Sequence, residues 1–326
     1  MQKKSLQYIS HGTTPTGGYM HETKLAETLS NVLQLPLSEF RYNKNTNGIF
    51  SIFKLWLFAF KHASNGINIT VQRLLLPVLL KSIVTNGKVI LVFHHYDVNE
   101  NKGQLYRLQF MLLKTIVRLN LSKITIVVVA NFWKDFFINE GINPKQIHLF
   151  PNFFDTQHYT QFKTTAKTKK QIYLGQYGEK QHPEIFRLAE MLNRDGYHCI
   201  FSTLDKTLIQ TTNTYEVNYF IPTDYLKMIA NCNYTVCLTK FNEGWNRTAH
   251  ESLLLGVPVI GNCTGGLCEL LQQAEQDIVS TAEQAYQIIK SNKEFTLAHN
   301  FIANYDIKQI PYYAKPIVSF CNNGIS

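Results

Sequence analysis

The sequence predicts an α/β protein made of two Rossmann-like domains that face each other across a cleft. The chain has 326 residues, which is more than one ordinary hydrophobic core covers, so two domains are expected. Apolar strand-like runs alternate with helical patterns in the first half, and the same alternation restarts in the second half. A polar segment without apolar periodicity, 156–170, separates the two halves. We therefore expect domains at 1–158 and 159–300, followed by a terminal segment at 301–326.

The first domain opens with a strand, a glycine-containing loop and a helix, which is the order that begins a doubly wound sheet. Two later apolar runs, KVILVF and KITIVVVA, lack polar alternation and predict buried parallel strands. Between 41 and 85, the turns NTNG and SNGINIT surround two apolar helices. The expected strands are 5–9, 88–93 and 123–130, and the other expected helices are 21–33, 104–120 and 132–140.

The second domain repeats this order after the polar segment. A strand, the glycine-containing loop GQYGEKQHPE and a helix come first, and Thr223 is placed to cap a later helix. The expected strand at 234–238 leads into the segment 241–271, which combines two glutamates with glycine turns. The expected strands are 171–174, 198–202, 215–221 and 234–238, and the expected helices are 185–194 and 224–230.

Composition indicates a globular protein, with 45% hydrophobic and 17% charged residues. The first residues lack the apolar run of a signal peptide, and the apolar run at 52–60 is too short to span a bilayer, so a soluble cytoplasmic protein is expected. None of the six cysteines forms a C-x-x-C pair, which disfavours zinc and disulfides alike. Cys237 and Cys263 are interpreted as small core residues.

The net charge of +9 is unevenly distributed. Residues 1–150 hold 17 Lys and Arg against 7 Asp and Glu, whereas residues 151–326 hold 15 against 16. The basic first half therefore favours an anionic partner, such as a membrane surface, a phosphorylated lipid or a nucleic acid. Nucleic acid is the weakest of these, because the basic residues are not interleaved with a stacking platform.

One predicted helix, 104–120, carries a cationic face. Arg107, Lys114 and Arg118 recur with Met111 at spacings of four, three and four, and apolar residues flank them. Such a face fits anionic lipid, and the alternative is an ordinary solvated surface. The aromatic segment that contains Trp56, Phe58 and Phe60 favours peripheral membrane contact.

Two groups in the first half are placed for chemistry. Gly17 and Gly18 lie in the first strand-to-helix loop, where glycine permits close backbone approach to an anion. The polar run that starts at His94 follows a buried strand, at the sheet edge where α/β proteins bind ligands. The alternatives are an ordinary turn for the glycines and a histidine, His94 or His95, that merely ends a strand.

In the second half, Glu243 precedes a predicted helix start near Asn246, and Glu251 lies within that helix. Helix capping and surface exposure are the alternative interpretation of the two carboxylates. Asp-x-Asp, Gly-x-Gly-x-x-Gly and P-loop motifs are absent from the sequence, and no metal-ligand spacing occurs. Nicotinamide and ATP enzymes are therefore disfavoured.

These segments resemble the retaining glycosyltransferases of family 4 (group 1), which have the GT-B fold. Glu243 and Glu251 match the Glu-x7-Glu pattern of that family, and GVPVI and the Gly265-Gly266 turn follow them in register. The run VVVANFWKDFFINEGINPKQIHLFPNFFD resembles the strand, helix and Pro-Asn-x-x-Asp bridge of the family. The resemblance spans most of the chain and is strongest over 123–155 and 175–271.

The resemblance implies a role for each matching residue. Glu251 would accept both ribose hydroxyls, Glu243 and His94 would face the transferred sugar, and Lys180 would neutralise the diphosphate. The terminal segment, with Pro311 and Pro316, would cross back to the first domain. The implied donor-binding residues are Gly17, Gly18, Lys180, Gly244, Trp245, Asn246, Arg247 and Glu251.

The sequence departs from the family at several positions. Gln176 stands where the family has arginine, so Lys180 and Arg247 would carry the phosphate charge. Asn246 replaces a common glycine, and Phe153 replaces the glycine of Pro-Asn-Gly. The loop at 175–180 is shorter than usual, and the glycine-rich segment expected after Glu269 is missing.

The expected activity is transfer of a hexose from UDP-sugar or GDP-sugar, with retention, to a lipid-linked or cell-surface polysaccharide or lipopolysaccharide acceptor. No metal or cofactor is required in this expectation. It places the protein in the cytoplasm, at the inner face of the cell membrane. Two alternatives keep the fold, namely a sugar-nucleotide epimerase and a non-catalytic nucleotide-sugar-binding module.

Overall fold

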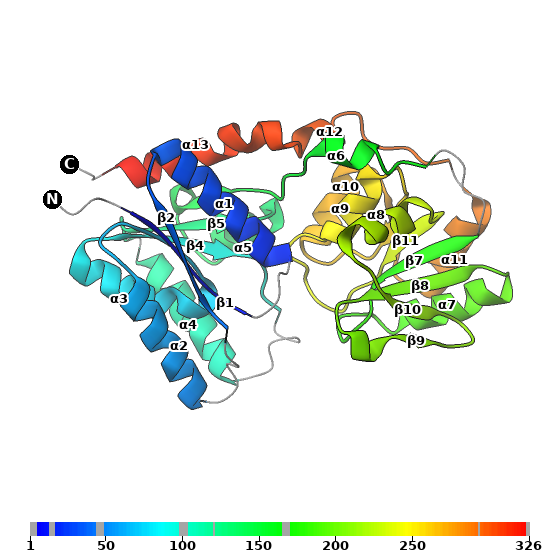
Figure 1. Cartoon of the computed structure of the whole chain (residues 1–326), viewed down its shortest axis with the longest axis horizontal. Coiled ribbons are helices and arrows are strands. Elements are labelled where there is room, and N and C mark those ends of the chain that lie inside the picture. The colour runs from blue at the N-terminus through cyan, green and yellow to red at the C-terminus, as the bar shows by residue number, and fades with distance from the viewer. Residues whose placement is uncertain are drawn as a thin grey trace. The chain divides into compact units, whose positions relative to one another are not determined.

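A computed structural model describes residues 5–12, 17–43, 49–97, 104–119, 121–164, 170–292 and 294–323 (Figure 1). The chain divides into two compact units. The first comprises Met1–Asn152 with Lys308–Ser326, and the second comprises Phe153–Ile307. The expected boundaries lay at 158 and 300, so the second unit takes in residues from both sides of its expected range.

The first unit is built on a six-stranded, entirely parallel sheet with the order β2-β1-β3-β4-β5-β6. The central strands are apolar and buried, as a parallel sheet covered on both faces requires. Strand order reverses beside β1, which makes the carboxyl ends of β1 and β3 a switch point where α/β sheets bind ligands. The strands are β1 (Leu6–His11), β2 (Leu37–Tyr42), β3 (Ile67–Val71), β4 (Lys88–Phe93), β5 (Ile124–Val128) and β6 (Ile147–Leu149).

Helices lie on both faces of this sheet. In Figure 1, α2, α3 and α4 lie together on one side, whereas α1 and α13 lie on the other and contact each other. The helix α13 also contacts β6, so the end of the chain belongs to the first unit. The helices are α1 (Gly17–Leu33), α2 (Ile49–His62), α3 (Leu75–Thr85), α4 (Gln104–Arg118), α5 (Asn131–Asn139) and α13 (Ile310–Asn322), with 3-10 turns η1 (Gln72–Leu74) and η2 (Pro144–Gln146).

The strand β3 corrects the sequence analysis, which assigned its residues to a turn. Asn68 and Thr70 are fully buried in this strand, although the alternation of INITV is typical of a strand with one polar face. The Asn68 side chain donates to the Ser82 hydroxyl and to the Ser64 and Lys88 carbonyls, and it accepts from the Ser64 amide. These four bonds satisfy the buried amide and explain why a polar residue lies in the centre of the sheet.

The second unit contains a seven-stranded sheet with the order β13-β12-β11-β7-β8-β10-β9, parallel except for β9 against β10. The order reverses between β11 and β7, which creates a second switch point at the carboxyl ends of these strands. The strands are β7 (Gln171–Gln176), β8 (His198–Thr203), β9 (Gln210–Thr211), β10 (Glu216–Tyr219), β11 (Tyr234–Cys237), β12 (Val259–Gly261) and β13 (Asp277–Ile278).

Within the described residues, the second unit also contains seven helices and the 3-10 turn η3, and the turn η4 begins at its last residue. They are α6 (Thr156–Thr160), α7 (Glu184–Arg194), α8 (Pro222–Ala230), α9 (Arg247–Leu254), α10 (Gly266–Gln273), α11 (Ala282–Ser291), α12 (Phe301–Asn304), η3 (Lys206–Leu208) and η4 (Ile307–Gln309). The apolar faces of α7 and α11 cover one cluster around β7, β8 and β11. The face of α8 covers a second cluster that includes Phe154 and Tyr159.

Several local predictions were wrong. The start of the expected linker is the helix α6, which Asp155 caps and which buries Tyr159 in the second unit. The helix α8 begins at Pro222, with Ile221 and not Thr223 as its N-cap, because proline is favoured at a first helical position. Cys263 is exposed and forms a disulfide with Cys268, whereas Cys237 is buried as expected.

The cationic face of α4 forms ion pairs with Glu140, the C-cap residue of α5. Lys114 and Arg118 both contact the Glu140 carboxylate, at 2.9 and 3.0 Å, and Arg118 also donates to the Glu140 carbonyl. Two of the three cations predicted to meet lipid therefore hold α4 against the end of α5. No helix within the described residues is long and apolar enough to span a membrane.

Candidate functional site

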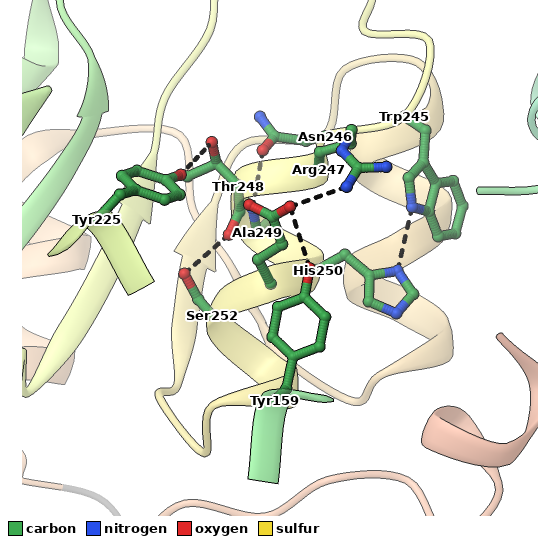
Figure 2. Close-up of polar contacts among 10 residues, drawn as sticks. Tyr159, Tyr225, Trp245, Asn246, Arg247, Thr248, Ala249, His250 and Ser252 are labelled. Atoms are coloured by element: carbon green, nitrogen blue, oxygen red, sulfur yellow. Dashed lines mark hydrogen bonds and ion pairs between the residues drawn. The ribbon is translucent and has the colours of Figure 1, made fainter. Parts of the chain in front are cut away.

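Glu251 is the centre of a polar cluster in the second unit. It lies in α9 as expected, and its Oε1 accepts from Arg247 at 3.0 Å and from the Tyr159 hydroxyl at 3.3 Å (Figure 2). Its other oxygen, Oε2, has no hydrogen-bond partner within the part of the chain that the structure describes. The side chain is 13% exposed, so Glu251 combines a fixed oxygen with one that can accept from a bound hydroxyl.

Burial raises the pKa of Glu251, while the Arg247 guanidinium and the Tyr159 hydroxyl oppose that rise. Burial also raises the pKa of Tyr159, and the Glu251 charge adds to the effect, so the phenol remains a donor. Arg247 stacks over the Phe154 ring, with 4.7 Å between its Cζ and the ring centroid. This cation–π contact and the ion pair fix the guanidinium at the start of α9.

The N-terminus of α9 has the geometry of an anion site. Asn246 is its N-cap, and the Asn246 Oδ1 accepts from the Ala249 amide at 2.9 Å. The preceding Gly244 and Trp245 are buried. Helix α9 starts just past the carboxyl end of β11, at the switch point of the sheet, where unpaired helix amides favour phosphate.

His250 is a residue that the sequence analysis missed. Its side chain is fully buried, and its Nδ1 accepts from the Trp245 indole at 3.1 Å. The Phe154 ring stacks on it with centroids 4.2 Å apart, and Phe301 and Tyr305 lie within 5 Å. Burial lowers the pKa of His250 well below its ordinary value, and the Arg247 charge lowers it further. The neutral imidazole therefore holds Trp245 against α9.

Glu243 is positioned by the glycine turn that follows β12. The Gly266 amide donates to the Glu243 carbonyl at 2.8 Å, and Gly265 forms a parallel bridge with Glu243. A Cβ on Gly265 would lie 2.4 Å from the Glu243 carbonyl oxygen, and Gly265 has a φ of +54°. The Gly265-Gly266 turn is thus required for close packing against the backbone of Glu243.

Lys180 is exposed in the loop after β7, and its carbonyl accepts from the Lys240 amide at 3.0 Å. The neighbouring residues Gln181 and Thr239 form an antiparallel bridge. The loop after β7 is therefore tied to the segment that leads from β11 to Glu243. Two lysines lie on these joined segments, beside the switch point, whereas Gln176 ends β7 and carries no charge.

His94 in the first unit forms an ion-pair geometry that the sequence did not reveal. It directly follows β4, and its Nε2 lies 2.7 Å from the Glu22 Oε1. The other Glu22 oxygen accepts from the Tyr8 hydroxyl at 2.6 Å, and Glu22 is buried. Burial and then the Glu22 charge raise the pKa of Tyr8, which stays a donor. In a neutral imidazole, the hydrogen bond from Nε2 to the carboxylate selects the tautomer in which Nδ1 is an acceptor, and Nδ1 has no hydrogen-bond partner among the described residues.

Gly18 packs directly against His94. A Cβ on Gly18 would lie 3.2 Å from the His94 Nε2, so only glycine leaves full room for the ring. Gly17 and Gly18 are the first residues of α1 and not a loop before it, which places exposed Gly17 at a helix N-terminus. The structure therefore brings together two predicted residues, Gly18 and His94, around the unpredicted Glu22.

The missed residues carried weak sequence signals. Glu22 lies on the buried face of α1 with Leu25, Ala26 and Leu29. A carboxylate on an otherwise apolar helix face indicates a buried polar partner, and this pattern could have identified Glu22. Tyr159 lay in a segment too polar to suggest packing. Among the described residues, no group of three or more His, Cys, Asp or Glu side chains could hold a metal ion.

Comparison with solved structures identifies the fold as GT-B. No family model and no curated protein sequence matches this chain. The structure of HepE from Anabaena in complex with UDP and glucose matches with a TM-score of 0.71 and 14% identity, over 97% of this chain and 99% of that one.

Two further matches have the same extent. A glycosyltransferase from Rickettsia africae gives a TM-score of 0.69 at 14% identity, over 98% of this chain and 100% of that one. The apo lipopolysaccharide outer core galactosyltransferase WaaB gives 0.61 at 11% identity, over 96% and 99%. The predicted α/β architecture of GT-B type is confirmed.

Proposed function

We propose that this protein is a retaining glycosyltransferase that moves a hexose from UDP-sugar or GDP-sugar to a lipid-linked or cell-surface glycan acceptor. The observation that carries the proposal is Glu251, a carboxylate with one oxygen fixed by Arg247 and Tyr159 and the other available. Its position at the switch point of the second sheet suits a nucleotide. The similarity to HepE, whose structure holds UDP and glucose, supports this choice of donor.

In this proposal Glu251 Oε2 accepts a ribose hydroxyl of the donor. The amides at the start of α9 and the two exposed lysines, Lys180 and Lys240, stabilise the diphosphate as negative charge develops on it. Lys240 supplies charge that Gln176 does not. Because carboxylate, amides and lysines all come from one unit, the donor is bound there, and in this proposal the lysines, in place of a metal, neutralise the diphosphate.

The proposed reaction breaks the bond between the sugar anomeric carbon and the diphosphate oxygen. The acceptor hydroxyl attacks the anomeric carbon on the face that the diphosphate leaves, and its proton passes to a diphosphate oxygen. The products are the glycoside and a nucleoside diphosphate. Glu243 stabilises the positive charge on the sugar, and His94 Nδ1 accepts from a sugar hydroxyl while Glu22 holds the ring.

The test follows the fate of the donor. Purified protein is incubated with a UDP-sugar and GDP-sugar panel, with and without a lipid-linked glycan acceptor, and products are resolved by chromatography and NMR. Nucleoside diphosphate released only with acceptor, together with an α-glycoside from an α-linked donor, is expected. Conversion of the donor into its epimer would instead identify an epimerase. Tight donor binding without any reaction would identify a binding module.

A further inference from the structure

The helix α2 presents its apolar side to solvent. Phe50, Phe53, Leu57 and Phe60 recur at spacings of three, four and three, so they form one stripe along the helix. They are 86%, 60%, 53% and 40% exposed, respectively. The opposite side of α2, which includes Leu55 and Ala59, is buried in the first unit. The exposed stripe is therefore additional to the face that the fold needs.

Cations border this stripe, and no carboxylate does so within its part of the sequence. Lys54 and Lys61 are exposed along one edge, and neither forms an ion pair among the described residues. On the other edge, Lys81 of α3 places its Nζ 5.1 Å from the Phe60 ring centroid. Between positions 40 and 96 the sequence contains seven Lys and Arg and no Asp or Glu.

The neighbouring helix α3 extends the apolar surface. Leu80, Ile83 and Val84 are exposed on α3, and α2 and α3 contact each other. Both helices lie on the same side of the first sheet (Figure 1). The surface thus continues beyond one helix, which distinguishes it from the isolated exposed apolar residues that most proteins have.

We propose that the outward face of α2 and α3 docks on an anionic lipid bilayer, with Phe50, Phe53, Leu57 and Phe60 inserted at the level of the head groups. A helix of 14 residues is about 21 Å long, which is too short to cross the bilayer and suits a helix that lies in its plane. The bordering lysines keep their charged ends at the phosphates while their stems lie along apolar surface. A protein partner normally offers and receives charges of both signs, and this region has only one.

This inference does not depend on the proposed reaction, and it places lipid contact on α2 instead of α4. Lys114 and Arg118 of α4 share the Glu140 carboxylate, which offsets one of their two charges and holds both side chains against the end of α5. On α2, the apolar stripe supplies the surface that is buried in the membrane, and Lys54 and Lys61 supply the attraction to anionic lipid.

Flotation of the full chain in a density gradient tests the proposal. Vesicles of phosphatidylcholine alone and of phosphatidylcholine with phosphatidylglycerol serve as probes. Wild type should float with the anionic vesicles at low salt, and less as salt is added. The Phe53→Ser/Leu57→Ser variant should bind them about tenfold more weakly or worse. The Lys54→Glu/Lys61→Glu variant should lose about as much.

Matched controls separate this face from general effects. Leu204 and Ile209 of the second unit are 59% and 50% exposed, so Leu204→Ser/Ile209→Ser removes similar apolar surface elsewhere and should leave flotation unchanged. Lys114→Gln/Arg118→Gln should also leave it unchanged, within about twofold. In Phe53→Trp protein, the indole emission should shift to shorter wavelength when anionic vesicles are added.

Three results would overturn the proposal. Wild type could remain unbound with both kinds of vesicle, or Phe53→Ser/Leu57→Ser could float as wild type does. Alternatively, size exclusion could show a dimer that dissociates on dilution and is abolished by Phe53→Ser/Leu57→Ser. In that case a second copy of the chain, and not lipid, covers the face.

Discussion

Acidification should destabilise the second unit through His250. This side chain is fully buried among aromatic rings, and its imidazole accepts a hydrogen bond from the Trp245 indole. Burial keeps its pKa well below the ordinary 6.5, so the folded state holds a neutral imidazole. Replacing His250 with glutamine removes the titration while keeping a side-chain oxygen that can accept from Trp245.

The sign of the effect follows from proton binding. Below pH 6.5 the unfolded chain protonates this histidine, whereas the folded chain does not until its lower pKa is reached. Stability is therefore fully present above pH 6.5 and falls as pH decreases, by about 1.4 kcal/mol per pH unit. Below pH 6.5, the free energy of unfolding of wild type should therefore fall relative to that of the His250→Gln variant, at a rate that approaches this slope until the folded-state pKa is reached.

Urea unfolding, followed by tryptophan fluorescence and circular dichroism at a series of pH values, measures this difference. His299→Gln is the control, because His299 is an exposed histidine of the same unit. Any constant offset between wild type and His250→Gln reflects packing, and only its change with pH reports the titration. Parallel stability curves for wild type and His250→Gln from pH 7 to 5 would refute the reasoning.

Three other substitutions test the packing of the site. Gly18→Ala adds a Cβ 3.2 Å from the His94 ring, so turnover should fall about tenfold, and unchanged turnover would contradict the role of His94. The free energy of unfolding, measured by thermal denaturation, should change by less than about 1 kcal/mol because alanine favours the helix. Gly265→Ala adds a Cβ 2.4 Å from the Glu243 carbonyl oxygen at a φ of +54°, so urea unfolding should show a loss of roughly 2–4 kcal/mol, and a loss below about 1 kcal/mol would show that the turn can relax. Cys263→Ser removes the disulfide with Cys268, which closes a short loop, so the free energy of unfolding should fall by about 2 kcal/mol. Dithiothreitol should destabilise wild type but not the variant, and equal sensitivity of the two proteins to dithiothreitol would argue against the disulfide.

The sequence predicted the architecture because apolar runs of parallel strands are conspicuous. The strands β4 and β5 are buried runs of aliphatic residues, and they were placed within a few residues of their ends. The strand β3 was missed because its residues directly follow the turn-like run SNG, and the alternation in INITV is only five residues long. Asn68 is buried there through hydrogen bonds to Ser82 and Lys88, which lie elsewhere in the sequence. Pattern recognition sees the polarity of a residue and not the partner that satisfies it.

The same limit applies to the candidate site. Glu251 was predicted from the resemblance to the Glu-x7-Glu pattern, and Gly18 and His94 were predicted from their places next to the ends of predicted strands. Their partners were not, because Glu22 and Tyr159 lie far from them in the sequence and approach them only in the fold. The charges of α4 show the converse, since a regular cationic face was visible while its Glu140 partner on α5 was not.

The availability of Glu251 for a nucleotide is the central claim, and calorimetric titration of UDP and GDP tests it most directly. Wild type should bind one of the two, and Glu251→Gln should weaken that binding about tenfold or more, because a charge-assisted hydrogen bond is lost. Glu190→Gln, at an exposed position on α7 of the same unit, should bind as wild type does. Equal affinity of wild type and Glu251→Gln for the nucleotide would contradict the account.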